Sequence, residues 1–119
     1  MKTPVPLIEA SITLLPALAG PRVLASRQYR PHIVIGPASQ RFAVVAEGNH
    51  LTEKYLGVVF WSGAEQIEPG QTVIAKLALM YYPEPENHYS AVLPGAEFTV
   101  REGAKVVGYG TVLRRDEWT

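Results

Sequence analysis

The sequence contains no cysteine, which excludes disulfide cross-links and a thiol nucleophile. It also has no apolar run long enough to cross a membrane as a helix, and Pro4, Pro6 and Glu9 interrupt the apolar residues near its start. We therefore expect neither a signal peptide nor membrane association. A cytoplasmic location is the expectation that fits a chain without cysteine.

The chain carries no net charge, because eleven basic residues balance eleven acidic ones. A nucleic-acid binder gains much of its affinity from neutralising phosphates, so a neutral chain needs a local basic patch. Residues 1–46 hold five basic residues against one acidic residue, and four arginines in this region are candidates for such a patch: Arg22, Arg27, Arg30 and Arg41. Arginines scattered over solvated loops are the alternative interpretation.

Motifs of known catalytic sites are missing as well. There is no G-x-S-x-G nucleophile turn and no G-x-x-x-x-G-K phosphate loop. His32, His50 and His88 lie too far apart in the sequence to suggest zinc. Glu84 and Glu86 are close enough to pair, but the prolines around them predict a solvated loop. We expect no cofactor, no metal, no nucleotide binding by this chain alone, and a function other than catalysis.

What the sequence does contain is a series of strand patterns. In residues 7–15, Ile8, Ala10, Ile12 and Leu14 fall on one side, which predicts a first strand. Residues 16–30 are predicted to form a long loop. Further strands are predicted at four ranges: 32–35, 42–46, 55–61 and 72–82. The last of these is preceded by Glu68-Pro69-Gly70-Gln71, in which proline and glycine are placed for a type II turn.

Residues 97–113 predict a hairpin. Phe98 and Val100 alternate with polar residues, which is typical of a strand with one face in a core and one in water. Residues 102–105 supply a polar turn with a glycine. The returning strand contains Gly108 and Gly110, which are unfavourable in a plain strand and therefore indicate a bend or a close backbone approach.

Six or seven strands at this spacing, with almost no helical pattern, predict an all-β fold. We expect a six-stranded antiparallel β-barrel, closed or nearly closed. Its expected bounds are 7–115, with an N-terminal extension at 1–6 and a C-terminal tail at 116–119. A chain of 119 residues fits one such domain, which would bury about two thirds of its unfolded surface.

The run F-T-V-R-E-G-A-K-V-V-G-Y-G, from Phe98 to Gly110, resembles the closing hairpin of the third domain of translation elongation factor Tu. That hairpin typically reads F-x-I-R-E-G-G-R-T-V-G-x-G. Two further segments follow the order of the family: Tyr29–Pro31 resembles its G-Y-R-P-Q segment, and Glu68–Gln71 resembles its M-P-G-D turn. The resemblance covers most of the chain from residue 7 to 115 and implies the same six-stranded barrel.

The resemblance also implies binding. In the family this barrel packs on a nucleotide domain, contacts elongation factor Ts, and touches the T-stem of aminoacyl-tRNA partly through the R-E-G-G turn. Arg101, Glu102 and Gly103 match that turn. An RNA site would use these three with nearby cations, and its candidate residues are Arg101, Glu102, Gly103, Lys105, Arg30 and Arg41. An ordinary hairpin turn is the alternative interpretation.

Three functions of different classes follow. The leading one is a stand-alone barrel that binds a protein partner or itself, with four aromatic residues as candidate anchors: Trp61, Tyr81, Tyr82 and Tyr89. The second is an RNA-binding module linked to translation, for which titration with tRNA at low salt should show a steep salt dependence. The third is a small enzyme on a barrel scaffold, which would need a deep pocket with convergent titratable groups.

Overall fold

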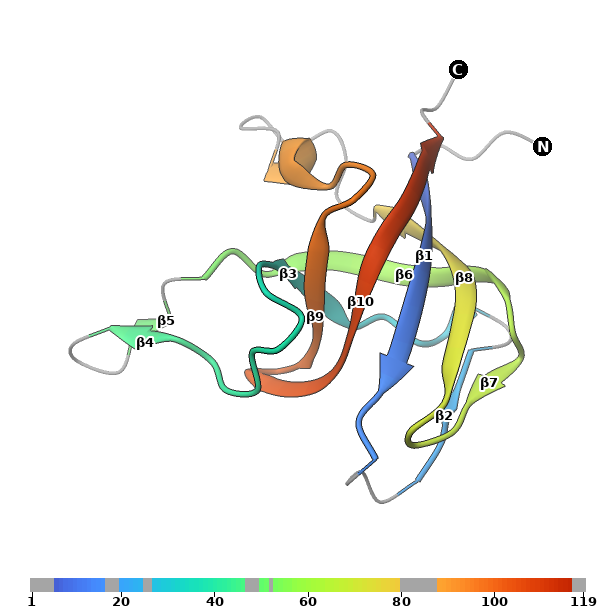
Figure 1. Cartoon of the computed structure of the whole chain (residues 1–119), viewed down its shortest axis with the longest axis horizontal. Coiled ribbons are helices and arrows are strands. Elements are labelled where there is room, and N and C mark those ends of the chain that lie inside the picture. Colours follow the sequence, from blue (N-terminus) through green and yellow to red (C-terminus); the bar gives the residue numbers. More distant parts are fainter. Residues whose placement is uncertain are drawn as a thin grey trace.

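Six strands of the chain close into an antiparallel barrel (Figure 1). The computed structural model describes residues 6–16, 20–24, 27–46, 50–51, 53–79 and 88–116. Around the barrel the strands follow the order β1 (Leu7–Leu14), β10 (Lys105–Asp116), β9 (Glu97–Glu102), β3 (His32–Ile35), β6 (Leu56–Gly63) and β8 (Thr72–Leu79). The predicted fold class is confirmed. Strand β10 runs one residue into the predicted tail, to Asp116.

The remaining elements are short. Two two-stranded sheets pair β2 (Arg22–Val23) with β7 (Gln66–Ile67), and β4 (Val45–Ala46) with β5 (His50–Leu51); a 3-10 helix, η2, spans His88–Ala91. Strand β2 lies inside the predicted loop at 16–30. No helix in the described ranges is long and apolar enough to cross a membrane.

One predicted strand is wrong. Residues 42–46 were expected in the barrel, but only the last two form a strand, and they pair with β5 outside it. Phe42 is 84% exposed and Val44 is also exposed, so these two apolar side chains do not pack in the core. The segment instead belongs to an excursion between β3 and β6, seen beside the barrel in Figure 1. The end of the predicted strand 72–82, at residues 80–82, lies outside the described residues.

The core fills the barrel interior. Alternate residues of β1 are buried as predicted, as are Phe98 and Val100 of β9. The predicted turn between β7 and β8 is also present, since the Gln71 N–H donates to the Glu68 carbonyl (2.9 Å) and Gly70 has a φ of 84°. The alternation of the sequence therefore places these core residues correctly, but Thr99, on the face of β9 that was expected in water, is also buried.

The two glycines of β10 mark a close approach, as predicted. Gly108 lies opposite Leu14 and Gly110 lies opposite Ile12 in the β1–β10 ladder. A Cβ atom at position 110 would lie well inside van der Waals distance of the Ser11 carbonyl oxygen and 2.7 Å from the Phe98 ring. The absence of a side chain here lets β1 and β10 come together over the Phe98 ring.

The barrel is least tightly paired between β3 and β6. These strands are joined by two register pairs, His32 with Gly57 and Ile33 with Leu56, whereas each other pair of neighbouring barrel strands has four or more. On its other side, β3 pairs with β9 along its whole length. The last residues of β3 are therefore paired with β9 on one side but are no longer paired with β6 on the other.

Candidate functional site

The tip of the β9–β10 hairpin is exposed. Gly103 has a φ of 61°, the left-handed conformation that glycine adopts readily, and no atom of the described residues would contact a Cβ added there. Ala104 and Lys105 beside it are also exposed. Gly103 and Lys105 of the predicted RNA site therefore lie where a ligand would reach them.

Arg101 is not available to a ligand, which corrects the expectation that this residue faces water. Its side chain is 0% exposed. Its Nη1 and Nη2 atoms donate to Oε1 and Oε2 of Glu53 (2.9 and 3.0 Å), Nη1 also donates to the Tyr55 hydroxyl (2.8 Å), and Nε donates to the Thr99 hydroxyl (2.9 Å). The donors that would meet a phosphate are used inside the protein.

Glu53 completes this buried network from the segment that precedes β6. Besides both Arg101 contacts, its carboxylate accepts hydrogen bonds from Gln40 Nε2 (2.7 Å) and from the Val44 N–H (3.0 Å). The hydrogen bonds from Arg101 are the main reason that the pKa of Glu53 falls from an ordinary 4.5 to about 2. The pair fastens the excursion between β3 and β6 onto the outer face of β9.

We predict that the Glu53 carboxylate makes folding stability depend on acid pH. Because its pKa is lower in the folded protein, the stabilisation is complete above about pH 4.5 and is lost as the pH falls toward about 2. Thermal unfolding followed by circular dichroism should show this loss in the wild type and a shallower one in Glu53→Gln. Parallel loss in both proteins over this range would show that the carboxylate does not contribute.

Glu102 is also engaged inside the fold. It accepts two hydrogen bonds from Arg22, from Nε (2.7 Å) and Nη2 (3.0 Å), and one from the Tyr29 hydroxyl (2.5 Å). The hydrogen bond from Arg22 is the main cause of a lowered pKa for Glu102. Burial, followed by the hydrogen bond to Glu102, raises the pKa of Tyr29 well above its ordinary range. Glu102 therefore ties the loop before β3 to the hairpin.

The predicted RNA site contains two further cations, Arg30 and Arg41, which lie outside the β9–β10 hairpin. Arg30 is exposed. Arg41 stacks over Tyr109, with its guanidinium carbon 4.8 Å from the ring centroid, and donates to the carbonyl oxygens of Ala38 (2.6 Å) and Gln40 (3.0 Å). No contact in the described structure joins Arg41 to the hairpin tip.

The structure describes two of the four aromatic residues that were predicted to bind a protein. Tyr89 is 1% exposed, and its hydroxyl donates to the Gly57 carbonyl (2.8 Å), so the expectation that it is a surface anchor is wrong. Trp61 is half-buried, and the Arg27 guanidinium lies 3.7 Å from its ring centroid. Tyr81 and Tyr82 lie outside the described residues.

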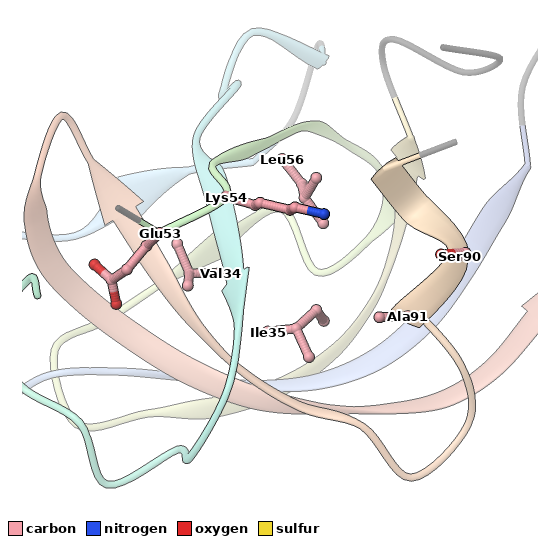
Figure 2. Close-up of a pocket in the computed structure, with 7 residues that line it drawn as sticks. All are labelled: Val34, Ile35, Glu53, Lys54, Leu56, Ser90 and Ala91. Carbon is pink, nitrogen blue, oxygen red and sulfur yellow. The ribbon is translucent and has the colours of Figure 1, made fainter. Parts of the chain in front are cut away.

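A pocket of about 340 Å³ opens where the pairing of β3 with β6 ends (Figure 2). It is lined by Val34, Ile35, Glu53, Lys54, Leu56, Ser90 and Ala91. The lining combines the end of β3, the segment entering β6, and η2. A second, more open depression of about 300 Å³ shares Ile35 and continues past Pro37 to Glu97.

The polar groups of the pocket differ in whether they can contact a ligand. Figure 2 shows the Lys54 side chain extended across the pocket, while the Glu53 carboxylate points away from it. The Glu53 carboxylate forms an ion pair with Arg101. Lys54 has no hydrogen bond or ion pair with any other residue that the structure describes, and Ser90 is exposed on η2. The charge left facing the pocket is therefore positive.

The sequence offered little sign of this site. Lys54, Ile35 and Ser90 come from three separate segments, and none belongs to a motif. The shortness of the strand at 32–35 was the one available signal. In the described ranges, no three His, Cys, Asp or Glu side chains come together as a metal site requires.

The chain was compared with models of known protein families and with curated proteins, and neither comparison gives a match.

Proposed function

We propose that this chain is a non-catalytic β-barrel binding module that takes a protein partner at the opening between β3 and β6. The observation that carries the proposal is the early end of the β3–β6 ladder beside a pocket of about 340 Å³. Strand edges that have lost their neighbour bind extended segments of other chains, and adjacent pockets select their side chains. The opening provides both.

The composition of the opening supports a protein ligand. Its lining includes the apolar side chains of Ile35, Leu56 and Ala91, together with the Lys54 cation and the Ser90 hydroxyl, both from exposed residues. Leu93, two residues after η2, is exposed and adds apolar surface close by in the chain. An apolar centre with a polar rim is the usual arrangement of a protein-binding surface. The resemblance to the third domain of elongation factor Tu supports the same class of function, since that domain is a docking domain.

RNA binding is the second candidate, and the exposed tip formed by Gly103, Ala104 and Lys105 is the observation that favours it. It ranks second because Arg101 and Glu102 of the same turn are engaged with Glu53, Arg22 and Tyr29. Three exposed cations, Lys105, Arg30 and Arg41, would then carry most of the phosphate contacts, which is few for a nucleic-acid site.

The test is site-specific cross-linking in cells that express the full chain. A photo-crosslinking amino acid at Ser90 should capture a protein, and the same group at Ala104, on the exposed hairpin tip, should not. Filling the pocket with Ala91→Arg should abolish the Ser90 adduct, because Ala91 lines it. A second copy of the chain counts as a protein partner and is recognised by the mass of the adduct.

Two results would overturn the proposal. One is the absence of any protein adduct from Ser90. The other is an adduct from Ala104 that ribonuclease removes, which would place RNA binding first.

A further inference from the structure

We infer that the pocket takes an extended segment of its partner in which an apolar side chain and a carboxylate lie two residues apart, on the same face of the segment. This inference rests on the proposed function and names the chemistry of the partner. It follows from three properties of the opening: the charge that Lys54 leaves uncompensated, the direction of the Ile35 backbone groups, and the size of the apolar floor.

Lys54 supplies the preference for a carboxylate. The neighbouring residue Glu53 would normally offset its charge, but both Glu53 oxygens are bonded to Arg101 and the carboxylate points away from the pocket (Figure 2). Lys54 reaches over the apolar lining with no ion pair to any described residue. Lys54 is exposed, so an incoming carboxylate can reach its ammonium group.

Ile35 supplies the preference for an extended backbone. Val58 and Phe60 donate their N–H groups to the carbonyls of Pro31 and Tyr29, so odd-numbered residues here direct their backbone groups toward β6. In the opposite direction, the Gly36 N–H donates to Glu97 of β9. The alternation of an antiparallel strand then directs the N–H and carbonyl of Ile35 toward the side where β6 no longer pairs. A strand-like segment would pair there.

The volume of the pocket limits the size of the group that can bind in it. A pocket of about 340 Å³ is at the small end of ligand sites and suits one or two side chains rather than a folded surface. Ile35, Leu56 and Ala91 provide contacts for an apolar side chain. In an extended segment, side chains two residues apart point to the same face, so an apolar side chain and a carboxylate with this spacing can enter the pocket together and meet its apolar lining and Lys54.

The experiment uses three pools of capped peptides of about seven residues, the length of an ordinary strand. Each pool has a leucine fixed two residues before a glutamate, a glutamine or a lysine, with random residues at the other positions. Binding to the isotope-labelled full chain is followed by NMR at the backbone amide of Ile35. We expect the glutamate pool to move this signal and to bind about threefold more tightly than the glutamine pool, as an ion pair with an exposed ammonium group allows.

Matched variants separate the pocket from general charge attraction. Lys54→Gln should remove the preference for glutamate, whereas Lys105→Gln, which removes the same charge from the exposed hairpin tip, should preserve it. Lys54→Glu should reverse the preference in favour of the lysine pool. Hexanoate serves as a free apolar carboxylate and should bind more weakly than the glutamate pool, because it has no backbone groups to pair with Ile35.

Equal binding of the glutamate and glutamine pools would overturn the inference, as would a glutamate preference that survives in Lys54→Gln. Hexanoate binding as tight as that of the peptides would also overturn it, since the site would then take small carboxylates. If these results came with a protein adduct from Ser90, the proposed function would stand without the inference. If no pool moved the Ile35 signal and Ser90 gave no adduct, both would fail.

Discussion

Replacing Arg101 with alanine is expected to lower the free energy of unfolding by about 3–5 kcal/mol, because it leaves the carboxylate of Glu53 without its ion-pair partner. The Glu53 side chain is only 10% exposed, so water replaces the lost hydrogen bonds poorly. The segment that Glu53 fastens to β9 would lose its main attachment. Urea denaturation monitored by fluorescence and circular dichroism measures the change.

Two control variants test the cause. Arg30→Ala removes an exposed arginine and should change the stability by no more than about 0.5 kcal/mol. The double variant Glu53→Gln with Arg101→Met removes both charges and should recover a large part of the loss, because no uncompensated charge remains. A loss from Arg101→Ala no larger than that from Arg30→Ala would contradict the burial of this pair.

Replacing Gly110 with alanine is expected to destabilise the barrel by about 3 kcal/mol or more, since overpacking costs about 1–3 kcal/mol even where the neighbours are side chains. Here the added methyl group would meet the Ser11 carbonyl oxygen and the Phe98 ring. Backbone cannot rotate away as a side chain does, so β1 and β10 would have to separate. Thermal and urea denaturation measure the effect.

Gly20 is the matched control for Gly110. A Cβ added to Gly20 would contact no atom in the part of the chain that the structure describes, and its backbone has no positive φ, so Gly20→Ala should be neutral or slightly stabilising. If the two substitutions had similar effects, close packing would not be the reason for glycine at position 110.

The sequence predicted the parts of this fold that depend on local pattern. The alternation of Ile8, Ala10 and Ile12 assigned the inner face of β1, since residues two apart in a strand share a side. The polar turn with Gly103 located the closing hairpin, and Gly110 marked a close approach. Each of these follows from residues adjacent or nearly adjacent in the chain.

Local sequence pattern also led to two wrong predictions. Residues 42–46 have the composition of a strand, yet Phe42 and Val44 are exposed, because a barrel of six strands leaves this segment outside. Tyr89 was expected at the surface, but it is buried with its hydroxyl bonded to Gly57. Whether an aromatic residue packs inside depends on what lies across from it, which a single segment does not specify.

By itself, the sequence determined the all-β class, the inward face of β1 and the position of the closing hairpin, because strand periodicity and turn chemistry act over a few residues. Only the tertiary structure decided that Arg101 is buried against Glu53, which lies 48 residues away, and that Lys54 is left facing a pocket as a result. Such pairings depend on which distant segments barrel closure brings together. The pattern of charge and hydrophobicity along the chain does not specify which residues become neighbours.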